Sequence, residues 1–91
     1  MDKQEIYKKA KRFFGGKIPK YVIDIGRDYI ILLVKFKGTG EEKGVYITFD
    51  DVKNYLYGYY ERLEPSKQIE MIKLGSIIPN LYSLFSYIVR G

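Results

Sequence analysis

The sequence predicts an α+β fold in a single domain, residues 1–91, with an N-terminal helix, a three-stranded antiparallel meander and three C-terminal helices. Apolar residues recur with helical spacing before residue 15 and after residue 50, whereas residues 21–49 show the alternation of strands. The predicted strands are joined by short connections, which favours antiparallel neighbours. The length of 91 residues is that of one domain, and a 46% hydrophobic content is typical of a folded chain.

The first helix is predicted over residues 3–14. When the segment is projected at 100° per residue, its apolar residues share one face and its basic residues lie on the other. The apolar face comprises Ile6, Tyr7, Ala10, Phe13 and Phe14. The helix should end at Gly15-Gly16, because glycine tolerates the left-handed conformation that closes a helix.

Three strands follow, predicted at Tyr21–Ile25, Tyr29–Lys37 and Val45–Phe49. In the first strand, alternation places Ile23 and Ile25 together on the core face. The opposite face of the sheet should carry Tyr29, Ile31, Leu33, Lys35, Lys37, Tyr46 and Thr48. The favoured interpretation is that the first helix covers Ile31 and Leu33 on this face.

Three helices complete the chain. The second should begin with Asp50 as its N-cap, because aspartate accepts hydrogen bonds from the free N–H groups of a first turn. Its apolar stripe would comprise Val52, Leu56, Tyr59 and Leu63, so that the helix runs as far as Glu64-Pro65. The third is predicted at 65–74. The last opens at Pro79 and turns Leu81, Leu84, Phe85 and Ile88 inward.

The composition excludes several kinds of site. The chain has no cysteine and no histidine, which rules out zinc centres of the usual kind and Ser-His-Asp or Cys-His catalysis. The close carboxylates are Asp24, Asp28, Asp50 and Asp51. Asp50 and Asp51 have a sufficient explanation as helix-start residues, and Asp28 as a turn residue. We therefore predict no catalytic residues, no metal, no cofactor and no enzymatic activity. We also expect a cytoplasmic protein without a membrane span, since no apolar run is long enough.

The charge is unevenly distributed along the chain. Residues 1–20 contain seven basic and two acidic residues, whereas residues 21–91 contain nine of each, so the whole net charge of +5 arises in the first fifth. Such asymmetry indicates a polyanion-binding element attached to a neutral body.

The sequence therefore predicts a small basic protein that binds nucleic acid, such as DNA, and contacts its phosphates through the first helix. Lys8, Lys11 and Arg12 project within about a quarter-turn of one another, and Lys9 lies at the edge of that face. Lys17 and Lys20 would extend the patch. Cationic side chains on one face suit rows of phosphates, because each neutralised phosphate releases counterions. The competing interpretation is an ordinary solvated helix face.

Two other surfaces remain as alternatives. On the open sheet face, Lys35, Lys37 and Tyr46 combine cations with an aromatic ring, as single-strand binders do. The alternative function is a protein-interaction module without a nucleic-acid role, such as an inhibitor, adaptor or homodimer. It would use Tyr57, Tyr87 and the Ile31/Leu33 face, since exposed tyrosines serve interfaces well.

Overall fold

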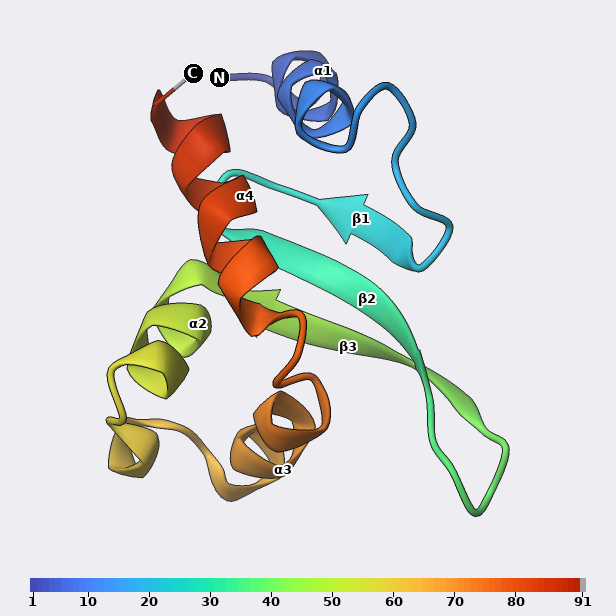
Figure 1. The fold of residues 1–91 in the computed structure, drawn as a ribbon, viewed down its shortest axis with the longest axis vertical. Helices are drawn as coiled ribbons and strands as arrows, with labels where there is room; N and C mark the ends of the chain where they lie inside the picture. The colour runs from blue at the N-terminus through green and yellow to red at the C-terminus, as the bar shows by residue number, and fades with distance from the viewer. Residues whose placement is uncertain (91) are drawn as a thin grey trace.

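The structure, a computed structural model, describes residues 1–90 and has the predicted α+β order of a helix, three antiparallel strands and further helices (Figure 1). Its elements are α1 (Lys3–Phe13), β1 (Val22–Ile25), β2 (Tyr29–Lys35), β3 (Glu42–Thr48), α2 (Phe49–Leu56), a 3-10 turn η1 (Tyr60–Arg62), α3 (Pro65–Lys73) and α4 (Ile78–Arg90). Helix α4 crosses one face of the sheet, α1 lies beyond β1, and α2 and α3 lie towards β3 (Figure 1).

The sheet is the predicted meander with β2 in the centre. Between β2 and β3 the register is regular from Tyr29↔Thr48 to Lys35↔Glu42, so β3 starts earlier and β2 ends earlier than the sequence predicts. Between β1 and β2 the register shifts at Val22/Asp24, where a β-bulge interrupts the alternation. The prediction that Ile23 faces the core is therefore wrong, because the bulge turns it outward and leaves it 51% exposed.

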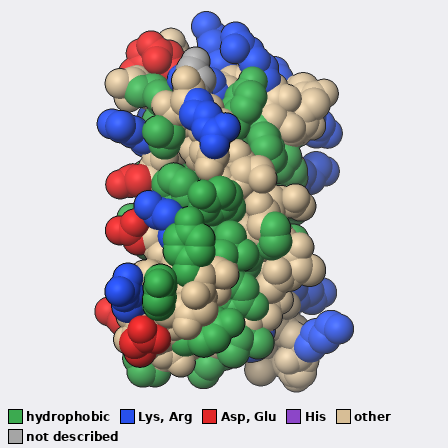
Figure 2. All heavy atoms as spheres, turned by 60° about the vertical axis from the view of Figure 1, so that its left-hand side comes forward, with side chains coloured by type: hydrophobic (Ala, Val, Ile, Leu, Met, Phe, Trp, Pro, Cys, Tyr) green, Lys and Arg blue, Asp and Glu red, His purple; other side chains and the backbone are tan. Residues whose placement is uncertain are grey.

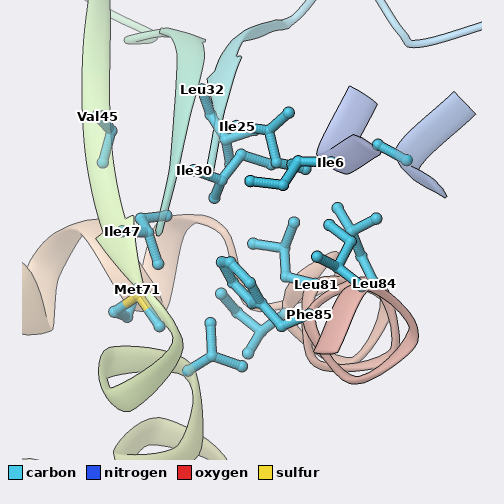
Figure 3. Close-up of a cluster of buried hydrophobic side chains, with 14 of the residues drawn as sticks. Ile6, Ile25, Ile30, Leu32, Val45, Ile47, Met71, Leu81, Leu84 and Phe85 are labelled. Atoms are coloured by element: carbon cyan, nitrogen blue, oxygen red, sulfur yellow. The ribbon is translucent and has the colours of Figure 1, made fainter. Parts of the chain in front are cut away.

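One apolar core lies between the sheet, α4 and α1 (Figure 3). The sheet contributes Ile25, Ile30, Leu32, Val45 and Ile47, and α1 contributes Ile6 and Ala10. The predicted inward residues of α4, Leu81, Leu84, Phe85 and Ile88, are all buried there. No polar or charged residue among residues 1–90 is buried, so the core is held by apolar packing alone.

Helix α2 differs from the prediction at both ends. Its N-cap is Thr48 rather than Asp50, in a capping box where Thr48 accepts from the Asp51 N–H and Asp51 accepts from the Thr48 N–H. The helix ends at Leu56, because Gly58 takes a φ of 79° that breaks the helical path. Leu56 and Tyr59 are therefore exposed, while Leu63 joins the core from beyond η1.

The face of the sheet opposite α4 is not covered by α1. That helix packs against α4 and beyond the β1 edge, and Leu33 remains 38% exposed, so the predicted cover over Ile31 and Leu33 is wrong. The reason lies in α1 itself, whose Ile6 and Ala10 are used in the core between the sheet and α4.

Among the described residues no single helix has the length and apolarity to cross a membrane. Helices α3 and α4 reach that length and composition only as a pair, with a bend of 100° between them.

Candidate nucleic-acid interface

Helix α1 is fixed to the body of the protein at both of its ends. Asp2 caps its first turn by accepting from the Glu5 N–H at 2.9 Å, and Lys3 in that turn bonds to Asp24 of β1. Its last turn carries Phe13, whose ring lies 6.0 Å from that of Tyr87 on α4. The buried residues Ile6 and Ala10 hold the middle. The helix therefore presents its outer face in a fixed orientation, unlike a loose basic tail.

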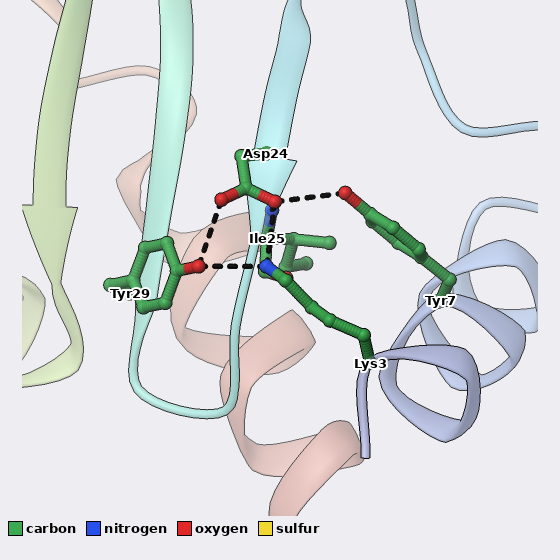
Figure 4. Close-up of polar contacts among 5 residues, drawn as sticks. All are labelled: Lys3, Tyr7, Asp24, Ile25 and Tyr29. Atoms are coloured by element: carbon green, nitrogen blue, oxygen red, sulfur yellow. Dashed lines mark hydrogen bonds and ion pairs between the residues drawn. The ribbon is translucent and has the colours of Figure 1, made fainter.

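A polar cluster at the start of α1 joins the helix to β1 (Figure 4). The Lys3 ammonium donates to Asp24 Oδ1 at 2.7 Å, to the Tyr29 hydroxyl at 2.7 Å and to the Ile25 carbonyl at 3.0 Å. The hydroxyls of Tyr7 and Tyr29 both donate to the Asp24 carboxylate at 2.8 Å. These contacts bring together three segments: the first two turns of α1, β1 and the start of β2.

The ionisation of this cluster follows from its hydrogen bonds. Those from Lys3 and then Tyr29 hold the pKa of Asp24 well below its usual range. The hydrogen bond to Asp24 likewise raises the pKa of Lys3, with a smaller contribution from Tyr29. The pKa of Tyr7 is raised chiefly because its proton is bonded to Asp24. Asp24, Lys3 and Tyr7 are therefore stabilised in their ordinary charge states, which suits a structural contact between α1 and β1.

The outer face of α1 carries cations without anionic partners. Lys8, Lys11 and Arg12 are exposed, and none of them takes part in the five ion pairs found within residues 1–90. In Figure 2 blue side chains gather at the top of the molecule, the end that α1 occupies in Figure 1. We call Lys8, Lys11 and Arg12 the α1 cationic face.

Lys9 was predicted to belong to the phosphate-binding set itself, and two further cations were predicted to support it. Lys17 and Lys20 are exposed in the segment between α1 and β1, again without an ion pair among the described residues. Lys9 is half-buried instead, and its ammonium donates to the Ile88 carbonyl at 3.3 Å. A cation is favourable at the carboxyl end of a helix, so Lys9 also stabilises the packing of α1 on α4.

A hollow of about 380 Å³ lies next to α1 and was not predicted from the sequence. Its walls include Phe13 from α1 and Tyr82, Tyr87 and Arg90 from α4. Phe13 was assigned to the core and Tyr87 to a separate surface, because the sequence does not show that α1 and α4 touch. The hollow places aromatic rings and the Arg90 cation where α1 meets α4, and none of Lys8, Lys11 or Arg12 lines it.

The alternative surface on the sheet lies away from α1. Lys35 and Lys37 are at the far end of β2, and Tyr46 is 51% exposed on β3, where its ring stacks on Tyr29 at 5.4 Å. The structure therefore does not bring Lys35 and Lys37 together with the α1 cationic face.

Tyr57 is 58% exposed beyond the end of α2. The hydroxyl of Tyr82 is the main cause of the raised pKa of Tyr57. Tyr87, the other predicted partner contact, lines the hollow beside α1 instead.

Of the four close carboxylates, three already have partners, and the fourth, Asp28, lines a hollow with Asp50. Asp24 belongs to the polar cluster at the start of α1, Asp51 to the capping box, and Asp50 forms an ion pair with Lys53 at 3.4 Å. Within residues 1–90 no group of three or more acidic residues is close enough to hold a metal ion.

Comparison with known proteins adds no family to this geometry. The chain matches no protein-family model, and neither the curated proteins nor the solved structures contain a significant match. The proposed function therefore depends on the geometry and charge of the site alone.

Proposed function

We propose that this protein is a non-enzymatic nucleic-acid-binding protein whose α1 cationic face contacts phosphates. The observation that carries the proposal is the set Lys8, Lys11 and Arg12, exposed and without ion pairs within residues 1–90, on a helix anchored at both ends. A fixed row of cations loses little conformational freedom when it meets a row of phosphates, and it gains from counterion release. With this function we propose a cytoplasmic location.

The hollow beside α1 supports single-stranded rather than duplex ligands. Bases of a single strand are free to stack on aromatic side chains, and such stacking tolerates any sequence. Tyr87 and Phe13 offer rings in the hollow where α1 meets α4, and Arg90 adds a charge there. We therefore expect binding with weak sequence preference, in which phosphate contacts dominate the affinity.

A salt titration tests the proposal. A fluorescein-labelled mixed-sequence DNA of about twelve nucleotides is titrated with protein at increasing salt, and anisotropy gives the affinity. Four or five phosphate contacts predict a slope of log K against log salt of roughly −3 to −4. Absence of binding at about 50 mM salt would contradict the proposal, because electrostatic binding is strong there.

The decisive variant replaces Lys8, Lys11 and Arg12 together with glutamine. These side chains are exposed, so circular dichroism and the melting temperature should stay close to those of the parent. The affinity should fall roughly tenfold or more, and the slope should become shallower by about 2. The matched control replaces Lys35, Lys37 and Lys73, three exposed cations away from α1, with glutamine. Equal losses in both variants would refute a role specific to α1.

A further inference from the structure

The central strand β2 extends beyond its neighbour β1. The paired residues of β1 and β2 end at Val22↔Leu32, and the last backbone bond between the two segments runs from the Leu33 N–H to the Tyr21 carbonyl at 2.7 Å. On its other side β2 stays paired with β3 as far as Lys35↔Glu42. One edge of β2 is thus left open over its last residues, although it is the middle strand of the sheet.

The direction of the backbone groups shows what this open edge offers. In an antiparallel strand the N–H and C=O of one residue point to the same side, and successive residues alternate. Leu33 bonds towards β1, whereas Phe36 donates to Glu41, on the β3 side. Lys35 therefore points its N–H and C=O away from β3, where β1 has already ended. Within residues 1–90 no backbone partner meets them.

Two hollows of about 320 Å³ each flank this edge, and both are lined by Val34 and Lys35. Leu74 and Ile77, between α3 and α4, line the first hollow, with Tyr21 at its end. Phe36 lines the second. An extended chain beside β2 would meet apolar side chains on its core-facing side.

On the open side of β2 the charged residues that line the two hollows are all basic, whereas Glu42 lies across from Lys35 on the β3 side. Lys35, Lys37 and Lys73 line the second hollow, and no acidic residue lines either hollow. The Lys73 ammonium lies 4.2 Å from the centre of the Phe36 ring, which places it over the apolar wall. A second copy of this edge would bring lysines against lysines, so the charges disfavour a homodimer here and favour an acidic partner.

We propose that the open edge of β2 binds an extended acidic peptide segment of a partner protein as an added strand. The backbone of Lys35 supplies the main-chain hydrogen bonds, as in other cases of strand addition. Because side chains alternate in a strand, one side of the peptide packs on Leu74 and Ile77 and the other presents carboxylates to Lys35. The recognised chemistry is an alternation of aliphatic and acidic residues. This surface is separate from the α1 cationic face.

Amide hydrogen exchange measured by NMR tests the proposal directly. In the free protein the Lys35 amide should exchange quickly, whereas those of Val34 and Phe36, directed towards β3, should be protected. The probe is an acetylated and amidated eight-residue peptide of alternating valine and glutamate. At saturation it should slow exchange of the Lys35 amide at least about tenfold. Peptide binding without protection of that amide would overturn the proposal.

Three matched peptides separate strand addition from charge attraction. Two of them carry methyl groups on the peptide nitrogens of one edge or of the other, which keeps the charge and removes those hydrogen-bond donors. The version methylated on the edge that pairs with β2 should bind about tenfold or more weakly than the parent peptide. A peptide of alternating valine and lysine should not bind. Equal affinity for the parent peptide and for both edge-methylated versions would overturn the proposal.

Two substitutions of Lys35 distinguish strand addition from charge attraction on the protein side. Lys35→Ala removes the charge and keeps the N–H. Lys35→Pro removes both, without breaking a bond to β3. The proline variant should bind the acidic peptide several-fold more weakly than the alanine variant, with both folds checked by their melting temperatures. Protection of the Lys35 amide by single-stranded DNA, or by raised protein concentration alone, would assign the edge to nucleic acid or to a second copy and overturn the proposal.

Discussion

At the residue scale, the contact between Gly26 and Tyr29 explains why a glycine occupies the turn from β1 to β2. Gly26 is buried, and a side chain there would overlap the Tyr29 ring. The Gly26 N–H also donates to the Tyr29 carbonyl at 2.9 Å, which closes the turn. The missing side chain thus lets Tyr29 lie flat enough to reach Asp24 and Lys3 with its hydroxyl.

Gly26→Ala should therefore destabilise the protein. The new methyl group must displace the Tyr29 ring and weaken its two hydrogen bonds, so we expect a loss of about 1–3 kcal/mol in the free energy of unfolding. Urea denaturation followed by circular dichroism measures it. Gly44→Ala is the matched control, since a methyl group there would lie at an ordinary 3.5 Å from Ile31 Cγ2. Similar losses in both variants would contradict this account.

At the element scale, the contacts of Asp24 hold α1 on β1. The Asp24 carboxylate receives hydrogen bonds from Lys3 and Tyr7 of α1 and from Tyr29 of β2. Its pKa in the folded protein is well below the unfolded value of about 3.9, so the unfolded chain takes up the proton first as pH falls. The stabilisation is therefore complete above about pH 4 and is lost as the pH falls towards the lowered pKa.

Asp24→Asn should lower the free energy of unfolding at pH 7 by about 1 kcal/mol, a modest value because the pair is partly exposed. The difference between parent and variant should shrink as pH falls below about 4, and amides of α1 should exchange faster in the variant. Urea denaturation from pH 7 to 2 gives the first readout. Asp28→Asn, at an exposed turn residue, is the control and should show no such narrowing.

The sequence predicts elements better than their boundaries, and the physical reasons are visible in particular residues. The period of the apolar residues was enough to predict α1, the meander, α3 and the inward face of α4. The bulge at Ile23 could not be predicted, because alternation alone reports no register shift. Thr48 rather than Asp50 is the cap, because Thr48 Oγ1 accepts from the Asp51 N–H and the Asp51 carboxylate accepts from the Thr48 N–H. Gly58 was read as a helical residue although it ends α2.

At the scale of the whole molecule, two groups of exposed cations have no ion pairs within residues 1–90. One is the α1 cationic face, and the other is Lys35, Lys37 and Lys73, which line one hollow beside β2. The first group could be predicted from the charge distribution along the chain. The hollow beside Lys35 could not be predicted, because Leu74 and Ile77 line it and their position next to β2 depends on the tertiary fold.

Because the α1 cationic face and the open edge of β2 are separate, we expect DNA and the peptide to bind to the protein at the same time. Saturation with the valine–glutamate peptide should change the DNA affinity by less than about threefold, since exposed charges this far apart are screened at physiological salt. Anisotropy of labelled DNA, with and without the peptide, measures this. Displacement of DNA by the peptide would contradict separate surfaces, and the peptide of alternating valine and lysine is the control.

The packing of α1 on α4 has a consequence for synthesis of the protein. The β2–β3 hairpin closes between neighbouring segments, whereas α1 contacts a helix at the opposite end of the sequence, as the Lys9–Ile88 bond shows. Contacts so distant in sequence form late, and on the ribosome α1 must wait until α4 has emerged. In a nascent or truncated chain that lacks α4, the basic segment of α1 therefore has no helix to pack against. The α1 cationic face is ordered only when α4 is present.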